Sequence, residues 1–172
     1  MVGEGEIEVL SKQFHELFTQ IMTAKLVRLQ RQSSLEFSKA HDNLARQEDV
    51  SPSSTARLHN QANVHLIKNI ITAIVDSQRE LISRLAIPFN DALASDLKDQ
   101  MKTFVSPKWC AQLYKLNVSS ISKQHAARLK EEVHVNRSFF LKRAEAEIDL
   151  LADTLRKKKN DSSRTAGKSR TT

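Results

Sequence analysis

The chain has 172 residues, of which 40% are hydrophobic and 27% are charged, and its formal net charge is +7. This length suits one domain, and the hydrophobic fraction excludes a chain that is disordered throughout. The glycines are Gly3, Gly5 and Gly167, so the interior has none for tight hairpin turns or a phosphate-binding loop. We therefore expect an all-α fold.

The first helix is expected over residues 6–47, after a flexible N-terminus at 1–5. Its first apolar residues recur at alternating spacings of three and four, the pattern of a heptad seam. These residues are Ile7, Leu10, Phe14, Leu17 and Ile21. From Phe18 onward the seam drifts by one residue, as it does on a straight helix.

A second helix is expected over 53–103. Ser51 is placed to cap its N-terminus, with Pro52 at the first helical position. Pro88 falls inside this segment, so the helix either kinks there or stops near Ala86. The apolar residues continue in phase on both sides of Pro88, which favours a kink.

The second helix carries the densest apolar pattern of the chain. Its seam, interrupted by Gln78, consists of Val64, Ile67, Ile71, Ile74, Leu81 and Leu85. Ile70, Val75 and Ile82 broaden the seam, as expected for a helix buried between two neighbours. We therefore expect this stripe to form either the core or a contact with a helical partner.

A third helix is expected over 107–158, after a repeat of the serine-proline start at Ser106 and Pro107. Short connections make successive helices antiparallel neighbours. The predicted architecture for 6–158 is an elongated antiparallel three-helix bundle, or coiled-coil-like rod. The area that three helices bury is limited, so self-association or a helical partner is expected.

Five basic residues of the third helix recur every seven or eight positions: Lys108, Lys115, Lys123, Lys130 and Arg137. On one helix they would share an arc of about 80°. Such a row suits nucleic-acid phosphates, anionic lipid headgroups or an acidic helix. Alternatively, these side chains pair with acidic residues of a neighbouring helix.

The C-terminal segment accounts for most of the net charge. Residues 156–172 hold seven Lys or Arg and one acidic residue, which is +6 of the total of +7. We expect 159–172 to be a disordered basic tail. Arg156, Lys157, Lys158 and Lys159 resemble a nuclear-import signal. With no signal peptide and no transmembrane segment expected, an intracellular location follows, in the nucleus or the cytoplasm.

Residues that could carry catalysis are sparse. Glu131 and His134 have the spacing of a di-iron ligand pair, but the sequence holds no second copy of that motif. Cys110 stands alone, without a nearby histidine to activate it. We expect no enzyme activity, no metal or other cofactor, and no small-molecule substrate.

Two groups of proteins resemble this predicted architecture. Long antiparallel helices with a kink at Ile87-Pro88-Phe89 and a basic third helix are similar to BAR domains, the dimeric crescents that bind curved membranes. Rod-like subunits of larger assemblies, such as those of kinetochores or organelle biogenesis, are also similar. The leading expectation is a non-enzymatic scaffold or adaptor subunit. The alternatives are BAR-like binding of anionic membranes and, second, nucleic-acid or chromatin association through the tail.

Overall fold

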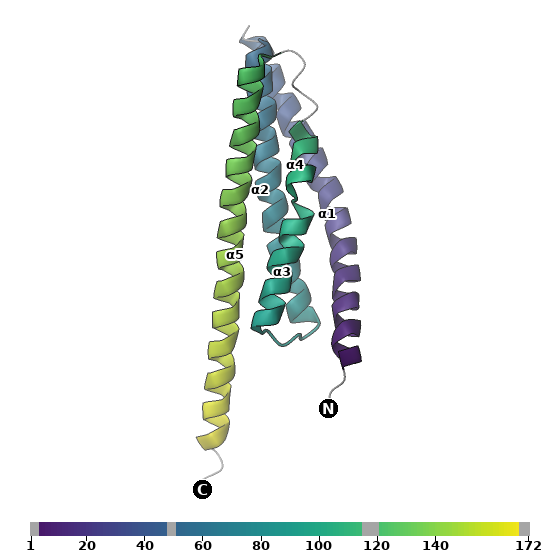
Figure 1. Cartoon of the computed structure of the whole chain (residues 1–172), viewed down its shortest axis with the longest axis vertical. Coiled ribbons are helices and arrows are strands. Elements are labelled where there is room, and N and C mark those ends of the chain that lie inside the picture. Colours follow the sequence, from purple (N-terminus) through teal and green to yellow (C-terminus); the bar gives the residue numbers. More distant parts are fainter. Residues whose placement is uncertain (1–3, 48–50, 115–120, 169–172) are drawn as a thin grey trace.

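A computed structural model of the chain describes residues 4–47, 51–114 and 121–168, with side chains described over 12–47, 51–112 and 121–154. Every regular element in this part is a helix, which confirms the all-α prediction. The helices are α1 (Glu4–Arg46), α2 (Pro52–Arg84), α3 (Asp91–Phe104), α4 (Pro107–Tyr114) and α5 (Lys123–Lys168). Figure 1 shows an elongated bundle in which α1, α3 and α4 run one way and α2 and α5 run the other.

Both serine-proline starts act as predicted. The Ser51 hydroxyl accepts a hydrogen bond from the Ser54 amide at 3.0 Å, and Pro52 is the first residue of α2. The Ser106 hydroxyl likewise accepts from the Trp109 amide at 3.2 Å, and Pro107 opens α4. In each case the side chain satisfies an amide that has no partner within the first helical turn.

The predicted kink at Pro88 is wrong, because the chain stops and turns back there. α2 ends at Arg84, and Ala86 adopts a left-handed conformation with φ of 51°. The Ile87 amide donates to the Ile82 carbonyl at 3.1 Å, and the Ala86 amide donates to the Ser83 carbonyl. These two bonds form a Schellman motif, which usually has glycine at its left-handed position. The chain therefore reverses into α3 in place of continuing a bent helix.

Replacing Ala86 with glycine should stabilise the protein by about 0.5–1 kcal/mol, because glycine has no Cβ to crowd a left-handed backbone. The same change at Ala24, which is exposed within α1, should instead destabilise it by about 1 kcal/mol. Urea denaturation measures both values. Equal destabilisation by the two variants would contradict the turn.

The single third helix predicted over 107–158 is also wrong. α4 ends at Tyr114, and α5 starts at Lys123 after Ser122, whose hydroxyl accepts from the His125 amide at 3.2 Å. The intervening residues include Asn117, Val118, Ser119 and Ser120, all weak helix formers. α5 is assigned as far as Lys168.

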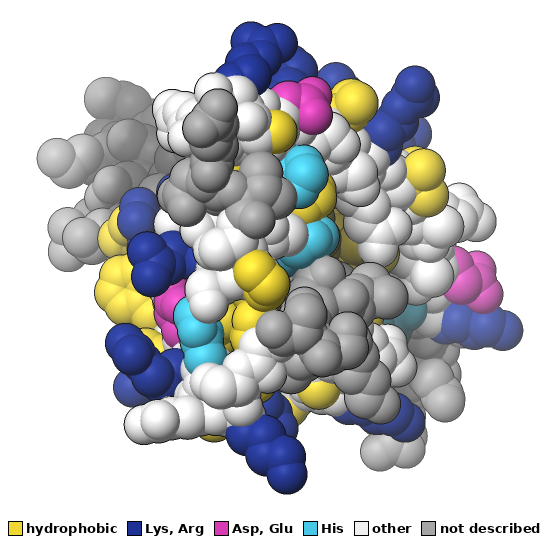
Figure 2. Space-filling view, turned by 90° about the horizontal axis from the view of Figure 1, so that it is seen from above, with side chains coloured by type: hydrophobic (Ala, Val, Ile, Leu, Met, Phe, Trp, Pro, Cys, Tyr) yellow, Lys and Arg dark blue, Asp and Glu magenta, His cyan; other side chains and the backbone are white. Residues whose placement is uncertain are grey.

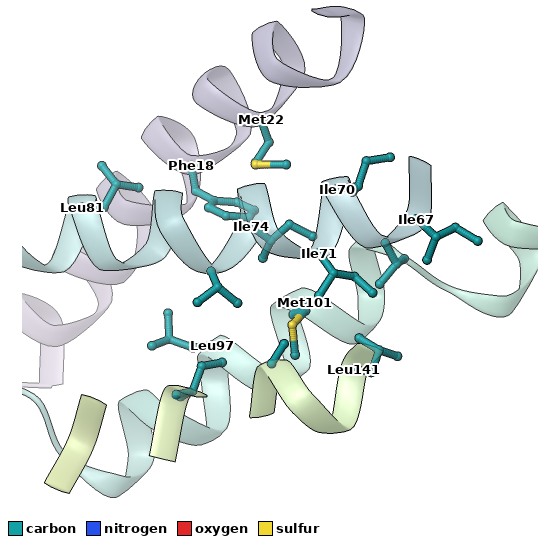
Figure 3. Packing of buried hydrophobic residues seen from close by; sticks show 14 of the residues in the cluster. Phe18, Met22, Ile67, Ile70, Ile71, Ile74, Leu81, Leu97, Met101 and Leu141 are labelled. Carbon is teal, nitrogen blue, oxygen red and sulfur yellow. The ribbon is translucent and has the colours of Figure 1, made fainter. Parts of the chain in front are cut away.

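The core is centred on α2, which contacts all four other helices. Figure 3 shows its isoleucines between Phe18 and Met22 of α1, Leu97 and Met101 of α3, and Leu141 of α5. The drift of the seam on α1 is confirmed, since Phe14, Phe18 and Met22 are buried. The break at Pro88 thus supplies a fourth helical layer, made of α3 and α4.

Candidate interaction surface

The apolar stripe of α2 forms the core of the chain. Ile67, Ile71, Ile74 and Leu81 are at most 3% exposed, and Val64 and Leu85 pack partly buried against the same cluster. Three layers of the chain's own helices cover this stripe, because α3 and α4 fold back on it. An external partner is therefore not needed to bury it.

Gln78, which interrupts the stripe, is buried and joins three helices. Its Nε2 atom donates to the Leu97 carbonyl at 2.9 Å and to Oε1 of Gln100 at 3.0 Å. Nε2 of Gln100 lies 2.9 Å from Nδ1 of His15 on α1. These directional contacts fix the register of α3 against α1 and α2.

The predicted basic stripe does not form one helix face. Lys108 lies on α4, whereas Lys123, Lys130 and Arg137 lie on α5, and Lys115 is outside the described residues. Seen down the bundle, Lys and Arg side chains are spread around the perimeter (Figure 2). Lys108, Lys123 and Lys130 are exposed. Lys123 and Lys130, seven residues apart, share one face of α5, whereas Lys108 belongs to another helix.

Arg137 has a structural contact. Its Nε atom donates to the carbonyl of Val105, the residue that caps the C-terminus of α3. A guanidinium at the end of a helix satisfies a free carbonyl and interacts favourably with the helix dipole. This side chain therefore joins α5 to α3 and is not free to meet an anionic surface.

Two other lysines pair with acidic residues across the α3–α5 interface. Lys98 Nζ lies 2.6 Å from Asp149, and Lys102 Nζ lies 2.6 Å from Glu145. The hydrogen bond from Lys102 to Glu145, together with the charge of Glu145, raises the pKa of Lys102. Pairing of basic side chains with acidic residues of a neighbouring helix was the alternative considered for the basic stripe. It occurs here at two lysines of α3 that are not part of that stripe.

Several predicted features lie outside the described side chains or form no site within them. Arg156, Lys157, Lys158 and Lys159 belong to the part of α5 whose side chains are not described. Glu131 is exposed and His134 half-buried, and the described residues contain no group of three or more side chains that could hold a metal. Within the same residues, no helix is both long and apolar enough to cross a membrane.

Cys110 is a buried structural thiol. Its side chain is 1% exposed, and burial raises its pKa, although the charge of Arg137 opposes this shift. A raised pKa keeps the thiol protonated and therefore weakly nucleophilic. Cys110 thus lacks the properties of a catalytic cysteine.

An aromatic contact joins α1 and α2 near the end viewed in Figure 2, where histidine side chains are visible. The rings of Phe37 and His59 are stacked with centroids 3.7 Å apart, and the ring of His41 lies 5.8 Å from that of Phe37. Burial, with a smaller contribution from the charge of His41, lowers the pKa of His59. The folded chain therefore favours neutral His59.

Acidification should weaken this contact. The pKa of His59 is lower in the folded chain than its ordinary value of 6.5. As the pH falls below 6.5, His59 is therefore protonated in the unfolded chain before it is protonated in the folded chain. The contribution to stability is complete above pH 6.5 and is lost as the pH falls toward the folded-state pKa. Urea denaturation between about pH 7.5 and 5 should show a steeper loss for the wild type than for His59→Phe, and equal slopes would contradict this.

Among the described residues, two of the cavities lie beside α1. One, of about 300 Å³, is formed by the turn at Pro88 and has a mainly apolar lining that includes Phe14, Leu93 and Leu97, with His15 and Asp96 as its titratable groups. The other, of about 440 Å³, is an open groove between α1 and α2 lined partly by Lys25 and Arg28. Neither lining contains the serine or cysteine of a nucleophilic site.

The outer face of α5 exposes large apolar side chains. Val135 is 57% exposed, Phe139 is 60% exposed and Leu150 is 67% exposed. With Ala146, also exposed, they lie within an arc of about 60° on the helix. We call these four residues the outer face of α5. The ring of Phe139 meets the ring of the half-buried Phe140 edge-on, with centroids 5.7 Å apart. Phe140 thereby restricts the orientation of the exposed Phe139 ring.

The charges beside this face have both signs. Glu131 and Glu132 precede it, and Lys142 and Arg143 follow Phe139. All four are exposed. A purely cationic border would suit an anionic surface, whereas alternating charges suit a protein surface with a matching pattern.

The sequence pattern identifies the inner face of α5 and not its outer face. The core residues of α5, such as Val133, Ala144 and Ile148, are indicated by their spacing and are buried. Val135 and Phe139 fall outside that spacing. The sequence signal that could have indicated the outer face was the presence of large apolar residues away from the core stripe.

Comparisons with protein-family models, curated proteins and solved structures find no match to this chain.

Proposed function

We propose that this protein is a non-enzymatic assembly subunit that binds a helical partner through the outer face of α5. The observation that carries the proposal is the exposure of Val135, Phe139 and Leu150 on one side of a single long helix. Isolated exposed apolar residues are common, but an aligned set on one helix is typical of helix–helix recognition.

The proposal moves the contact surface from α2 to α5. The stripe on α2 is already covered within the chain except at the partly buried Val64 and Leu85, so it has little apolar area to offer. α5 lies along one edge of the bundle (Figure 1), where its outer side is accessible to another helix.

The geometry supports the membrane alternative less than the sequence did. BAR-like binding rested on a kink at Pro88 and on one basic row, and the helices are arranged differently at both places. Acidic residues beside the outer face of α5 would also repel an anionic bilayer.

Co-purification from cells tests the proposal. The variant Val135→Asp/Phe139→Asp should lose its bound proteins while keeping a wild-type melting curve, because both side chains are exposed. The matched control, Val27→Asp/Leu35→Asp, changes two exposed apolar residues on α1, which are 64% and 55% exposed. It should keep the bound proteins. Equal retention by both variants would contradict the proposal.

A further inference from the structure

We propose that the helix that covers the outer face of α5 is α5 of a second copy of this chain, bound antiparallel. This inference rests on the proposed function and identifies the partner. The two-fold axis passes between the two helices at the level of Arg137, midway between Val135 and Phe139. A contact of this kind is isologous, so each residue pair occurs twice.

The apolar side chains match across this axis. Val135 and Phe139 lie two residues before and after position 137, at equal heights on either side of it. In the antiparallel pair, Val135 meets Phe139 of the partner subunit, and Phe139 meets Val135 of the partner subunit. Two exposed aromatic rings and two β-branched side chains thereby become covered.

The charges match as well. Glu131 lies about 60° and Lys142 about 40° to the same side of the midline, some 9 Å and 7.5 Å along the helix from the axis. Antiparallel packing therefore brings Glu131 beside Lys142 of the partner subunit. Among the described residues, neither side chain takes part in an ion pair within the chain.

The opposite side of the midline repeats this pattern. Glu132 lies about 40° and Arg143 about 60° from the midline, at the corresponding heights. Both side chains also have partners within the chain, since Glu132 accepts a hydrogen bond from Asn60 at 2.9 Å and Arg143 lies 3.7 Å from Glu147. The dimer thus gains two pairs between Glu131 and Lys142, and two further pairs in which Glu132 and Arg143 are shared with those contacts. A parallel pair would place Glu131 beside Glu132 of the partner subunit and Lys142 beside Arg143 of the partner subunit, which is repulsive. The order of the charges therefore selects the antiparallel arrangement.

Sedimentation velocity on the purified full chain tests the inference. The wild type should show a reversible dimer at concentrations up to about 100 µM, a range suited to a small interface. Val135→Asp/Phe139→Asp should sediment as a folded monomer, whereas Val27→Asp/Leu35→Asp should dimerise like the wild type.

A charge swap tests the arrangement itself. Glu131→Lys and Lys142→Glu each turn two attractive pairs into repulsive ones, so each variant alone should dimerise roughly tenfold more weakly. In an equimolar mixture, the lysine introduced at position 131 of one variant would face the glutamate introduced at position 142 of the other. The native pair of Glu131 and Lys142 would form at the opposite end of the contact. The mixture should therefore regain the wild-type dissociation constant. Melting curves check that each variant is folded.

Three results would overturn the inference: a wild type that stays monomeric up to about 100 µM, a mixture that dimerises no better than its components, or an unaffected Val135→Asp/Phe139→Asp variant. If the wild type is monomeric but Val135→Asp/Phe139→Asp still loses its co-purifying proteins, the partner is a different protein. The inference then fails, and the proposed function stands.

Discussion

Replacing Ile71 with aspartate should abolish the cooperative unfolding transition. Ile71 is 3% exposed and lies in the α2 stripe, next to residues from several other helices (Figure 3). An unpaired carboxylate at this position costs several kcal/mol, which is comparable with the total stability of a domain, about 5–15 kcal/mol. Thermal melting followed by circular dichroism should therefore show a broad, low-temperature transition or none.

The matched control is Val27→Asp, because Val27 is a β-branched residue on α1 that is 64% exposed. This change should alter the free energy of unfolding by less than about 0.5 kcal/mol. If Ile71→Asp melted like Val27→Asp, the stripe would not be the core.

Leu97→Ala should lower the free energy of unfolding by about 2–5 kcal/mol, the usual cost of a cavity at a buried leucine. Leu97 is 2% exposed because α3 folds back against α2 and α5. If the second helix continued through a kink at Pro88, as the sequence suggested, Leu97 would lie on the continued helix and away from this core. Urea denaturation of Leu97→Ala therefore also tests the reversal of the chain.

Leu150→Ala makes the same chemical change on the outer face of α5, where the side chain is 67% exposed. Its expected effect is below about 0.5 kcal/mol. A small effect at both leucines would contradict the packing of α3.

The sequence predicted features that depend on local chemistry. Ser51-Pro52 and Ser106-Pro107 begin helices because the serine hydroxyl accepts a hydrogen bond from a free amide of the first turn, and the proline has the backbone angle of a first helical residue. Both effects are independent of the rest of the fold. The drift of the seam from Phe14 to Phe18 and Met22 follows from the pitch of a straight helix. The buried residues of α2 were also correct, because their spacing matches a broad helical face.

The turn at Pro88 could not be located by the same reasoning. The apolar positions stay in phase across it because α2 and α3 both face one core. The left-handed residue that ends α2 is Ala86, not the glycine that usually marks such a turn. Only the packing of α3 against α2 and α5 shows that the chain reverses.

Whether the α2 stripe is the core or a partner contact also depends on the tertiary structure. Counting helices predicted that three of them would leave the α2 stripe partly uncovered, but the fourth layer covers it. The exposed residues Val135 and Phe139 are ordinary apolar residues in the sequence, and only the positions of α2, α3 and α4 leave them on the outside of α5.

Site-specific photocrosslinking tests the role of the outer face of α5 most directly. A photoreactive phenylalanine analogue replaces Phe139 in one preparation of the purified chain and Val27 in another. From position 139 we expect covalent dimers in which the crosslinked peptide contains Val135. From position 27 we expect no dimer above background. Dimers formed from position 27 and not from position 139 would contradict the assignment of this surface.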